Sequence, residues 1–375
     1  MKRALTILSI LALAAGQGCS DPTAAPGVSE RAMPAPGFPP SHVTVYTQNM
    51  YVGADVDAVI AALASPDPND DIPALVAAVN TLQFTDYAAR ARGIAGEIAR
   101  VRPHVVGLQE VSTIDVDLPP LGVSLHTDFL ATLLADLHAR GVDYVVAAAH
   151  TNFTAAPAEG VSLVDRDVML VDASRVHVLT SAGHQFTDNL GVVAPGVDLE
   201  RGWVQITADI DGVTYAFASL HTEGSGPPEI TIPLHASQVA DVVASMGTQS
   251  PAIVMGDFNS DPVDPAIAVI TGGGFTDVWA ALHPGEPGLT CCELPDLSNL
   301  PNAFTDRIDY VFTRGFGGAQ GAEAMKGQIE RVDAFALNRV RNDAGKWIWL
   351  SDHAGLVATV RLPAASPGAE LGSGF

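Results

Sequence analysis

The stretch VMGDFNSDP, residues 254–262, has the pattern of a buried strand that runs into a polar turn. The apolar run ends at Gly256, and Asp257 and Asn259 follow it one residue apart. In an extended chain, residues i and i+2 point to the same side, so this stretch aims a carboxylate and a carboxamide at one place. An ordinary turn uses the same residue types. The rest of the chain decides between a turn and a site.

Length and composition describe an acidic chain with enough apolar residues for a sizeable core. Its 375 residues suffice for one large domain or two small ones of about 100 to 200 residues each. Hydrophobic residues make up 47%, and the formal net charge is −23, from 42 acidic and 19 basic residues. This charge balance argues against binding of nucleic acid through a large basic surface, because such binding needs Lys and Arg to neutralise phosphates. It leaves open a phosphate substrate that is held by a metal ion.

The first residues, MKRALTILSILALAAGQGCS, predict an export signal. A charged start precedes an apolar run that is too short to span a membrane as a stable anchor. Cys19 follows the tripeptide GQG, which resembles a lipoprotein cleavage site except that Gly16 stands where Leu is usual. We therefore expect residues 1–19 to be a signal peptide of the lipoprotein type, and Cys19 to anchor the protein to the membrane of the bacterial cell envelope. Simple secretion is the alternative.

The remaining chain divides into a tether, one domain and a tail. Residues 20–41 are rich in Pro, Ala and Gly and predict a flexible tether, because they lack the apolar residues for a core. Residues 42–362 alternate strand-like and helix-like patterns without a repeat or a second linker, which predicts a single α/β or α+β domain. Residues 363–375 predict a disordered tail. We expect the protein to be a monomer.

Helical spacing and capping signals predict three helices. The segment DYAARARGIAGEIARVRP, residues 86–103, begins at a capping residue, Thr85 or Asp86, and stops before a proline. The segment TDFLATLLADLHARG, residues 127–141, ends in a glycine. The segment PEITIPLHASQVADVVASM, residues 228–246, is helical towards its end.

Strand-like runs surround these helices. The Asp211-Gly212 step predicts a hairpin turn between two of them. The mixture of hairpins and crossovers favours two packed mixed sheets over one parallel sheet. The runs occupy residues 42–49, 104–110, 142–150, 161–171, 175–182, 202–210, 213–221, 251–257, 307–314 and 355–362.

Several other strands end in polar residues, as the opening stretch does. Each of these signals is weak by itself, since a lone Glu after a strand is usually solvated and a lone His more often makes a structural hydrogen bond. Together they repeat one pattern at many strand ends. The residues are Asn49, Glu110 and His221 at strand ends, Asp309 within the apolar run RIDYVF, and the neighbouring pair Asp352 and His353 just before the final strand.

Part of this set offers ligands for a metal ion. The carboxylates of Glu110 and Asp352, helped by the amide of Asn49, supply hard oxygens of the kind that suits Mg²⁺ or Mn²⁺. We therefore expect Mg²⁺ as the cofactor, with Mn²⁺ as the alternative.

The rest of the set can move protons and hold a phosphate. His221 and His353 can donate or accept protons near neutral pH. Asp309 could orient one imidazole, and Asn259 could hold a phosphate oxygen or a water. This inventory is typical of metal-assisted hydrolysis at phosphorus, where positioning and charge neutralisation matter most.

The ordered blocks TQN, GLQE, SLH, MGDFN, RIDYVF and SDH resemble the signature blocks of the endonuclease/exonuclease/phosphatase superfamily. Members of this deoxyribonuclease I-like superfamily include repair nucleases, inositol polyphosphate 5-phosphatases and neutral sphingomyelinases. The blocks run from residue 47 to residue 353. The stretches QNMYVGAD and GLTCCELPDL further resemble exported bacterial members. The resemblance implies an α+β fold, a four-layer αββα sandwich of two mixed sheets with helices outside and a site at one edge.

The resemblance also implies roles for the residues at the metal and at the phosphate. Glu110 resembles the principal metal ligand, with Asn49 and Asp352 nearby as metal or phosphate contacts. Asp257 and Asn259 resemble the pair that orients the nucleophile and the scissile phosphate.

Acid–base roles follow from the same resemblance. His353 resembles the general base and is paired with Asp309. His221 resembles the histidine that contacts the phosphate and assists the leaving group. Whether His353 or Asp257 activates the water stays open.

Three further features have weaker functional interpretations. Arg166 in VDRDVML could contact a phosphate from the rim of the site, although a surface ion pair is the alternative. Cys291 and Cys292 are adjacent, and adjacent cysteines make a strained ring that rarely serves as a staple. Their redox state stays open. Residues 112–125, STIDVDLPPLGVSL, could supply an exposed apolar loop near the site.

The sequence therefore predicts an exported, Mg²⁺-dependent phosphoesterase. Its substrate could be nucleic acid, a phospholipid head group or a small phosphoester. The alternative is a surface lipoprotein that keeps the fold and binds a phosphorylated ligand without catalysis.

Overall fold

The computed structural model of the chain describes residues 42–67, 69–119, 122–317, 325–332 and 339–363. The predicted signal peptide and tether, and residues 364–375 of the predicted tail, lie outside this part of the chain. Among the described residues, no helix is both long enough and apolar enough to cross a membrane.

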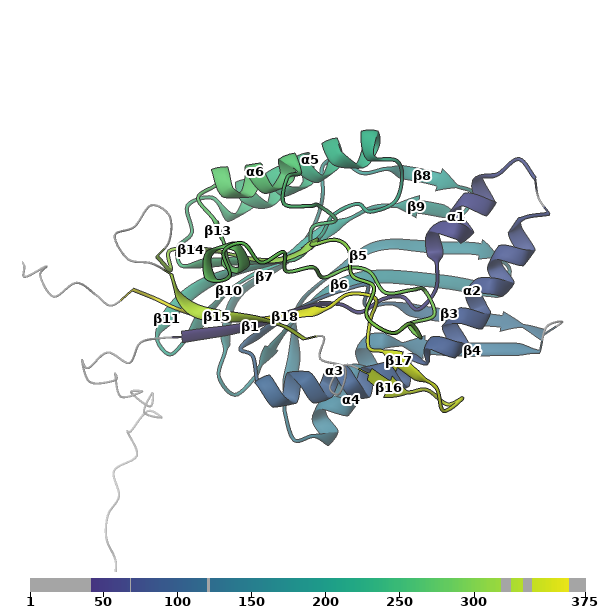
Figure 1. Cartoon of the computed structure of the whole chain (residues 1–375), viewed down its shortest axis with the longest axis horizontal. Coiled ribbons are helices and arrows are strands. Elements are labelled where there is room, and N and C mark those ends of the chain that lie inside the picture. Colours follow the sequence, from purple (N-terminus) through teal and green to yellow (C-terminus); the bar gives the residue numbers. More distant parts are fainter. Residues whose placement is uncertain (1–41, 68, 120–121, 318–324, 333–338, 364–375) are drawn as a thin grey trace, which may run out of the picture. The chain divides into compact units, whose positions relative to one another are not determined.

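The described residues form helices and strands whose arrangement is drawn in Figure 1. The helices are α1 (Val56–Ala64), α2 (Asp71–Thr85), α3 (Tyr87–Val101), α4 (Phe129–Ala139), α5 (Pro228–Met246), α6 (Pro265–Gly272) and α7 (Val278–Leu282). The strands are β1 (His42–Asn49), β2 (Val105–Gln109), β3 (Thr113–Leu118), β4 (Val123–Asp128), β5 (Tyr144–Ala158), β6 (Val161–Asp172), β7 (His177–Gln185), β8 (Gly191–Ala194), β9 (Val197–Leu199), β10 (Gly202–Ile210), β11 (Val213–His221), β12 (Ala252–Asp257), β13 (Thr276–Asp277), β14 (Asp309–Arg314), β15 (Lys326–Val332), β16 (Arg339–Arg341), β17 (Trp347–Trp349) and β18 (Gly355–Arg361).

Most strands belong to two mixed sheets. The larger sheet has the order β15-β18-β1-β2-β6-β5-β9-β8, and β3 and β4 extend it beside β6. The smaller sheet has the order β13-β14-β12-β11-β10-β7. Each sheet contains parallel and antiparallel pairs: β1 is parallel to β2 but antiparallel to β18, and β12 is parallel to β11 but antiparallel to β14. The predicted two mixed sheets are confirmed.

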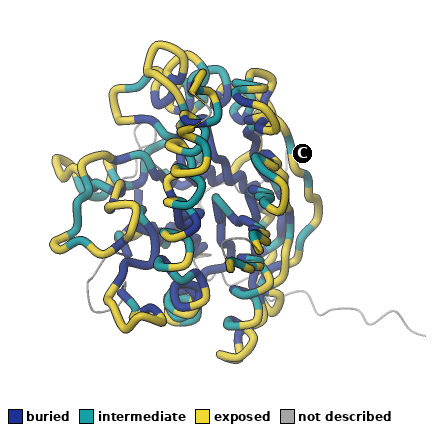
Figure 2. Tube along the Cα trace, turned by 90° about the vertical axis from the view of Figure 1, so that its right-hand side faces the viewer, coloured by how far each residue is buried: buried dark blue, intermediate teal, exposed yellow. Residues whose placement is uncertain are grey.

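Alternation along the strands divides apolar side chains between the two faces of each sheet. Val43 of β1 and Met255 of β12 belong to one buried cluster between the sheets. Tyr46, on the opposite face of β1, belongs to a cluster with Ile94 of α3 and Leu133 of α4. Helices α5 and α6 cover the outer face of the smaller sheet in the same way (Figure 1). Figure 2 shows the buried segments inside these layers and the exposed segments around them. The predicted α+β four-layer sandwich is confirmed.

Local signals explain where α3 begins and ends. The side chain of Asp86 accepts a hydrogen bond from the N–H of Ala89. Of the two candidate capping residues, Thr85 and Asp86, the N-cap of α3 is therefore Asp86. The helix ends at Val101, because the C-cap residue Arg102 has a φ of 52°, in the left-handed region, and Pro103 cannot continue the helix. The predicted hairpin also forms: Asp211 and Gly212, with φ of 54° and 82°, connect β10 and β11.

Other segments differ from the expectations. The described part of the segment 112–125, residues 112–119 and 122–125, is not an exposed apolar loop, because β3 and β4 pair antiparallel and Ile114 and Val116 are buried. Helix α5 starts at Pro228 and contains Pro233, so it occupies the whole segment rather than its later part. The sequence analysis predicted none of the helices α1, α2, α6 and α7.

Candidate active site

Strand register brings three of the predicted site residues into one row of the smaller sheet. In the parallel pair β11–β12, His221 lies opposite Asp257, and in the antiparallel pair β12–β14, Asp257 lies opposite Asp309. All three side chains face the other sheet, because they continue the inward alternation of Phe217 and Met255. The strand end that opened the sequence therefore delivers its carboxylate between the two sheets.

The larger sheet delivers Asn49 and Glu110 to the same edge. β1 and β2 run parallel with Asn49 opposite Gln109, so Glu110 follows directly at the strand end. The amide Nδ2 of Asn49 donates to Glu110 Oε1 and to Asp257 Oδ2, both at 3.0 Å. Its oxygen accepts the N–H of Tyr51 at 2.9 Å. In this arrangement Asn49 is a bridge that ties the carboxylates of the two sheets together.

The loop before β18 places Asp352 and His353 against this edge. Nδ1 of His353 lies 2.9 Å from Oδ2 of Asp309. Its Nε2 lies 3.8 Å from Asp257 Oδ2 and 4.0 Å from Asp352 Oδ1. Burial lowers the pKa of His353, but the neighbouring carboxylates outweigh this effect, and the pKa lies well above its usual value. One imidazole nitrogen is thus held by a carboxylate while the other is directed towards the site.

Arg201, between β9 and β10, completes the surroundings of His221. Its NH1 lies 3.2 Å from Nδ1 of His221 and 3.9 Å from Asp165 Oδ2, and its NH2 lies 3.6 Å from Glu223 Oε1. Because a guanidinium only donates, Nδ1 of His221 must accept, and the neutral ring carries its proton on Nε2. That nitrogen lies 3.6 Å from Asp257 Oδ2. Burial, with Arg201 next in effect, holds the pKa of His221 well below its usual value.

Sequence reasoning missed Asp165, Arg201 and Glu223. A signal was present in VSLVDRDVMLV, where two aspartates interrupt an otherwise apolar strand. Both are buried in β6, and burial raises the pKa of Asp165. Arg166 lies between them, so alternation turns it to the opposite face, where its NH1 donates to Thr113 Oγ1 at 3.0 Å. The structure therefore does not bring Arg166 to the site, and Arg201 supplies the positive charge there instead.

Most of the site residues described above line a cleft of about 360 Å³. Asn49 and Asp309 lie behind its wall, where they hold the residues that reach it. Among the described residues that line the cleft, Arg201 is the one Arg or Lys. Of the predicted site residues, the lining contains Glu110, His221, Asp257, Asn259, Asp352 and His353.

Negative charge accumulates in the cleft. Burial raises the pKa of Glu110 and of Asp257, and that of Asp352 to about 7. Repulsion adds to burial, since Asp165 raises the pKa of Glu110 and Asp309 raises that of Asp257. A divalent cation would relieve this repulsion, and carboxylate oxygens are the ligands that Mg²⁺ and Mn²⁺ prefer. The donor set therefore fits a divalent metal ion.

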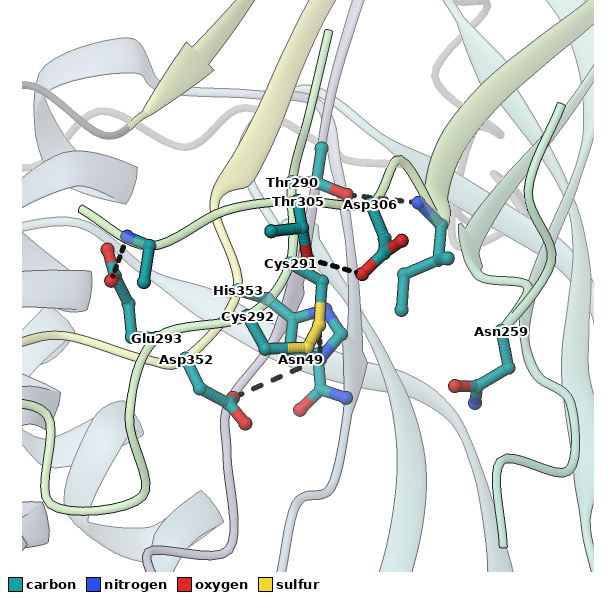
Figure 3. The surroundings of a disulfide bond; sticks show 12 residues. Asn49, Asn259, Thr290, Cys291, Cys292, Glu293, Thr305, Asp306, Asp352 and His353 are labelled. Atoms are coloured by element: carbon teal, nitrogen blue, oxygen red, sulfur yellow. Dashed lines mark hydrogen bonds and ion pairs between the residues drawn. A yellow bond between two sulfur atoms is a disulfide. The ribbon is translucent and has the colours of Figure 1, made fainter. Parts of the chain in front are cut away.

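The adjacent cysteines lie beside His353 in the cleft wall, as Figure 3 shows. A disulfide joins Cys291 and Cys292. Sγ of Cys291 lies 3.6 Å from Nε2 of His353, and Cys292 lines the cleft. The backbone of Cys291 also forms bridges with Asp306 and His353. The disulfide therefore forms part of the surroundings of His353, the candidate general base.

Two packed mixed sheets with outer helices, and a polar cleft at the strand ends, define a deoxyribonuclease I-like protein. Residues 77–353 match the Endonuclease/Exonuclease/phosphatase family, and the chain belongs to this family. The general chemistry of this family is the cleavage of phosphate esters. No curated protein matches the chain at a significant level.

Solved structures share the fold at low sequence identity. An endonuclease/exonuclease/phosphatase family protein from Bacteroides thetaiotaomicron has a TM-score of 0.54 and 15% identity, over 87% of this chain and 97% of that one. An endonuclease/exonuclease/phosphatase from Beutenbergia cavernae has a TM-score of 0.54 and 20% identity, over 86% and 72%. A mannosyl-6-phosphatase from Bacteroides thetaiotaomicron has a TM-score of 0.52 and 16% identity, over 85% and 99%. At these identities the likeness concerns the fold.

Proposed function

We propose that this protein is an exported, divalent-metal-dependent hydrolase that cleaves a phosphate ester by attack of an activated water. The observation that best supports the proposal is the hydrogen-bonded pair of His353 and Asp309. His353 lines one cleft together with buried carboxylates from both sheets. Membership of the family supports phosphoester cleavage as the general activity. Export and the lipid anchor at Cys19 rest on the N-terminal sequence.

Glu110 and Asp352 are the residues that would hold the metal, with Mg²⁺ preferred over Mn²⁺. Asn49 would act by orienting Glu110, because its amide oxygen already accepts a backbone N–H. Ligand atoms of Asp257, Asp309 and His353 also lie within 4.8 Å of one another, but two of these residues already bond each other. When bound, the metal would neutralise phosphate charge and make a water more acidic.

Proton transfer falls to His353 or Asp257. Asp309 fixes the tautomer of His353 and stabilises the imidazolium that forms when Nε2, the other ring nitrogen, takes a proton. Oδ2 of Asp257 is the other acceptor, since it lies within 4 Å of both histidines. Positioning of the attacking water by Asp257 and Asn259 agrees with the bond from the Asn259 N–H to Asp257 Oδ1, 2.9 Å long.

His221 would act as a hydrogen-bond donor. Arg201 holds Nδ1 as an acceptor, so the proton on Nε2 faces the cleft beside Asp257. A neutral donor can contact a phosphate oxygen and assist the leaving group without adding a second buried cation.

The test is hydrolysis of bis-p-nitrophenyl phosphate by the protein from residue 20 onward, with Mg²⁺ and then with excess EDTA. We expect release of p-nitrophenolate that EDTA abolishes and added Mg²⁺ restores. Parallel incubations with DNA, sphingomyelin and inositol phosphates would identify the substrate class. Binding of a phosphorylated ligand without turnover of any ester would instead support a non-catalytic surface lipoprotein.

A further inference from the structure

An apolar groove of about 80 Å³ lies beside the catalytic cleft. Its walls are α1, α2 and the neighbouring part of the larger sheet, and α1 lies against α2 and β8 (Figure 1). Leu75 and Ala78 line it from α2, and Ile114 and Val116 line it from β3. The groove therefore occupies the space between the helical hairpin and the sheet.

The groove and the cleft share a wall. Six residues line both, so the two spaces lie side by side with no other layer of the protein between them. Phe153 lies at the boundary between the groove and the cleft. It lines both spaces, and the centre of its ring lies 5.8 Å from the guanidinium of Arg201, which lines the cleft. The shared residues are Val52, Ala54, Val56, Ile60, Phe153 and Leu163.

The helix that covers the groove leaves its apolar face half-exposed. Val56, Val59, Ile60 and Leu63 form one stripe of α1 with the spacing i, i+3, i+4, i+7, and all four line the groove. Val56, Ile60 and Leu63 pack against buried clusters, yet all four residues of the stripe keep part of their surface exposed, and Ala62 is the buried residue of α1. An apolar occupant of the groove would bury them.

We propose that the substrate is a phosphate ester with an alkyl or acyl chain, whose chain fills the groove while its phosphate sits in the cleft. This inference rests on the proposed function. The position of the groove directly beside the cleft selects the occupant: a molecule that reaches both spaces needs a charged phosphate at one end and a flexible apolar chain at the other.

The size of the groove limits the chain length, since about 80 Å³ accommodates only a short chain. Burial of each methylene strengthens binding about fourfold. Affinity should therefore rise about fourfold per carbon and level off once the groove is filled.

The first test uses p-nitrophenyl alkyl phosphate diesters, from methyl to octyl, all dissolved as monomers. We expect kcat/KM to rise steeply with chain length and then to level off. Ala78→Phe fills the groove from α2 and should flatten this dependence. Ala77→Phe, on the exposed face of the same helix, is the matched control and should retain it. A flat chain-length dependence in the wild type would overturn the inference without recourse to any variant.

A binding measurement separates this inference from the proposed function. Calorimetry with methyl, butyl and octyl phosphate in the presence of Mg²⁺ needs no turnover. If no ester is hydrolysed but octyl phosphate binds far more tightly than methyl phosphate, the result supports the proposal that the groove binds an alkyl chain and contradicts the hydrolase proposal. If esters are hydrolysed while chain length changes neither rate nor affinity, the hydrolase proposal stands and the groove proposal is wrong.

Discussion

The pair of His353 and Asp309 gives the sharpest test of the site. Their hydrogen bond is 2.9 Å long and both side chains are buried, so Asp309 stabilises the imidazolium by a charge-assisted bond. Hydrogen bonds to charged groups contribute about 1.5–3 kcal/mol, so Asp309→Asn should lower kcat about 10- to 150-fold. Loss of the base in His353→Ala should lower kcat by about 100-fold or more.

The decisive variant combines the two substitutions. Since Asp309 acts through His353, the double variant should be little slower than His353→Ala alone. The assay is Mg²⁺-dependent turnover of bis-p-nitrophenyl phosphate, with the fold checked by circular dichroism. Asp306→Asn is the control, because Asp306 is exposed three residues before Asp309. Losses that multiply in the double variant would refute the pairing and make Asp257 the better candidate for the base.

Other predictions concern the metal, the buried arginine, pH and location. Glu110→Gln should weaken activation by Mg²⁺, with excess Mg²⁺ restoring part of the rate, because an amide is a poorer ligand for a hard dication; an unchanged metal titration would exclude Glu110 as the ligand. Arg201→Met removes the cation that pairs with the buried carboxylates and should lower the free energy of unfolding in urea by about 3–5 kcal/mol. A small change would instead mean that these carboxylates are protonated or solvated. Burial lowers the pKa of His104 from 6.5 to about 4, so the unfolded chain takes up a proton that the folded one does not, and stability should fall as pH drops through this window. His104→Asn keeps an acceptor for the backbone and should reduce that pH dependence. Detergent should release the protein from membranes, and Cys19→Ser should abolish membrane association; a soluble wild type cleaved elsewhere would exclude the anchor.

The sequence by itself determined the layers and the order of the polar blocks. Period-two patterns specify strands because one face of each strand must be apolar, and the cap at Asp86 with the proline after α3 specifies a helix. Where tertiary packing overrides local signals, prediction failed. Helix α5 tolerates Pro233, and the strands β3 and β4 pair with Ile114 and Val116 buried. Polar residues at strand ends were visible because they interrupt apolar patterns.

Only the tertiary structure decided how those residues meet. Asn49 and Asp257 are 208 residues apart in sequence, and their bond exists because two separate sheets pack with one register. Arg201 has no local pattern that marks it, and its role follows from side chains contributed by other strands. The groove beside the cleft likewise arises from the fit of α1 and α2 against the sheet. Residue types and periodicity are local properties of a chain, whereas distances between elements depend on long-range packing that no single segment encodes.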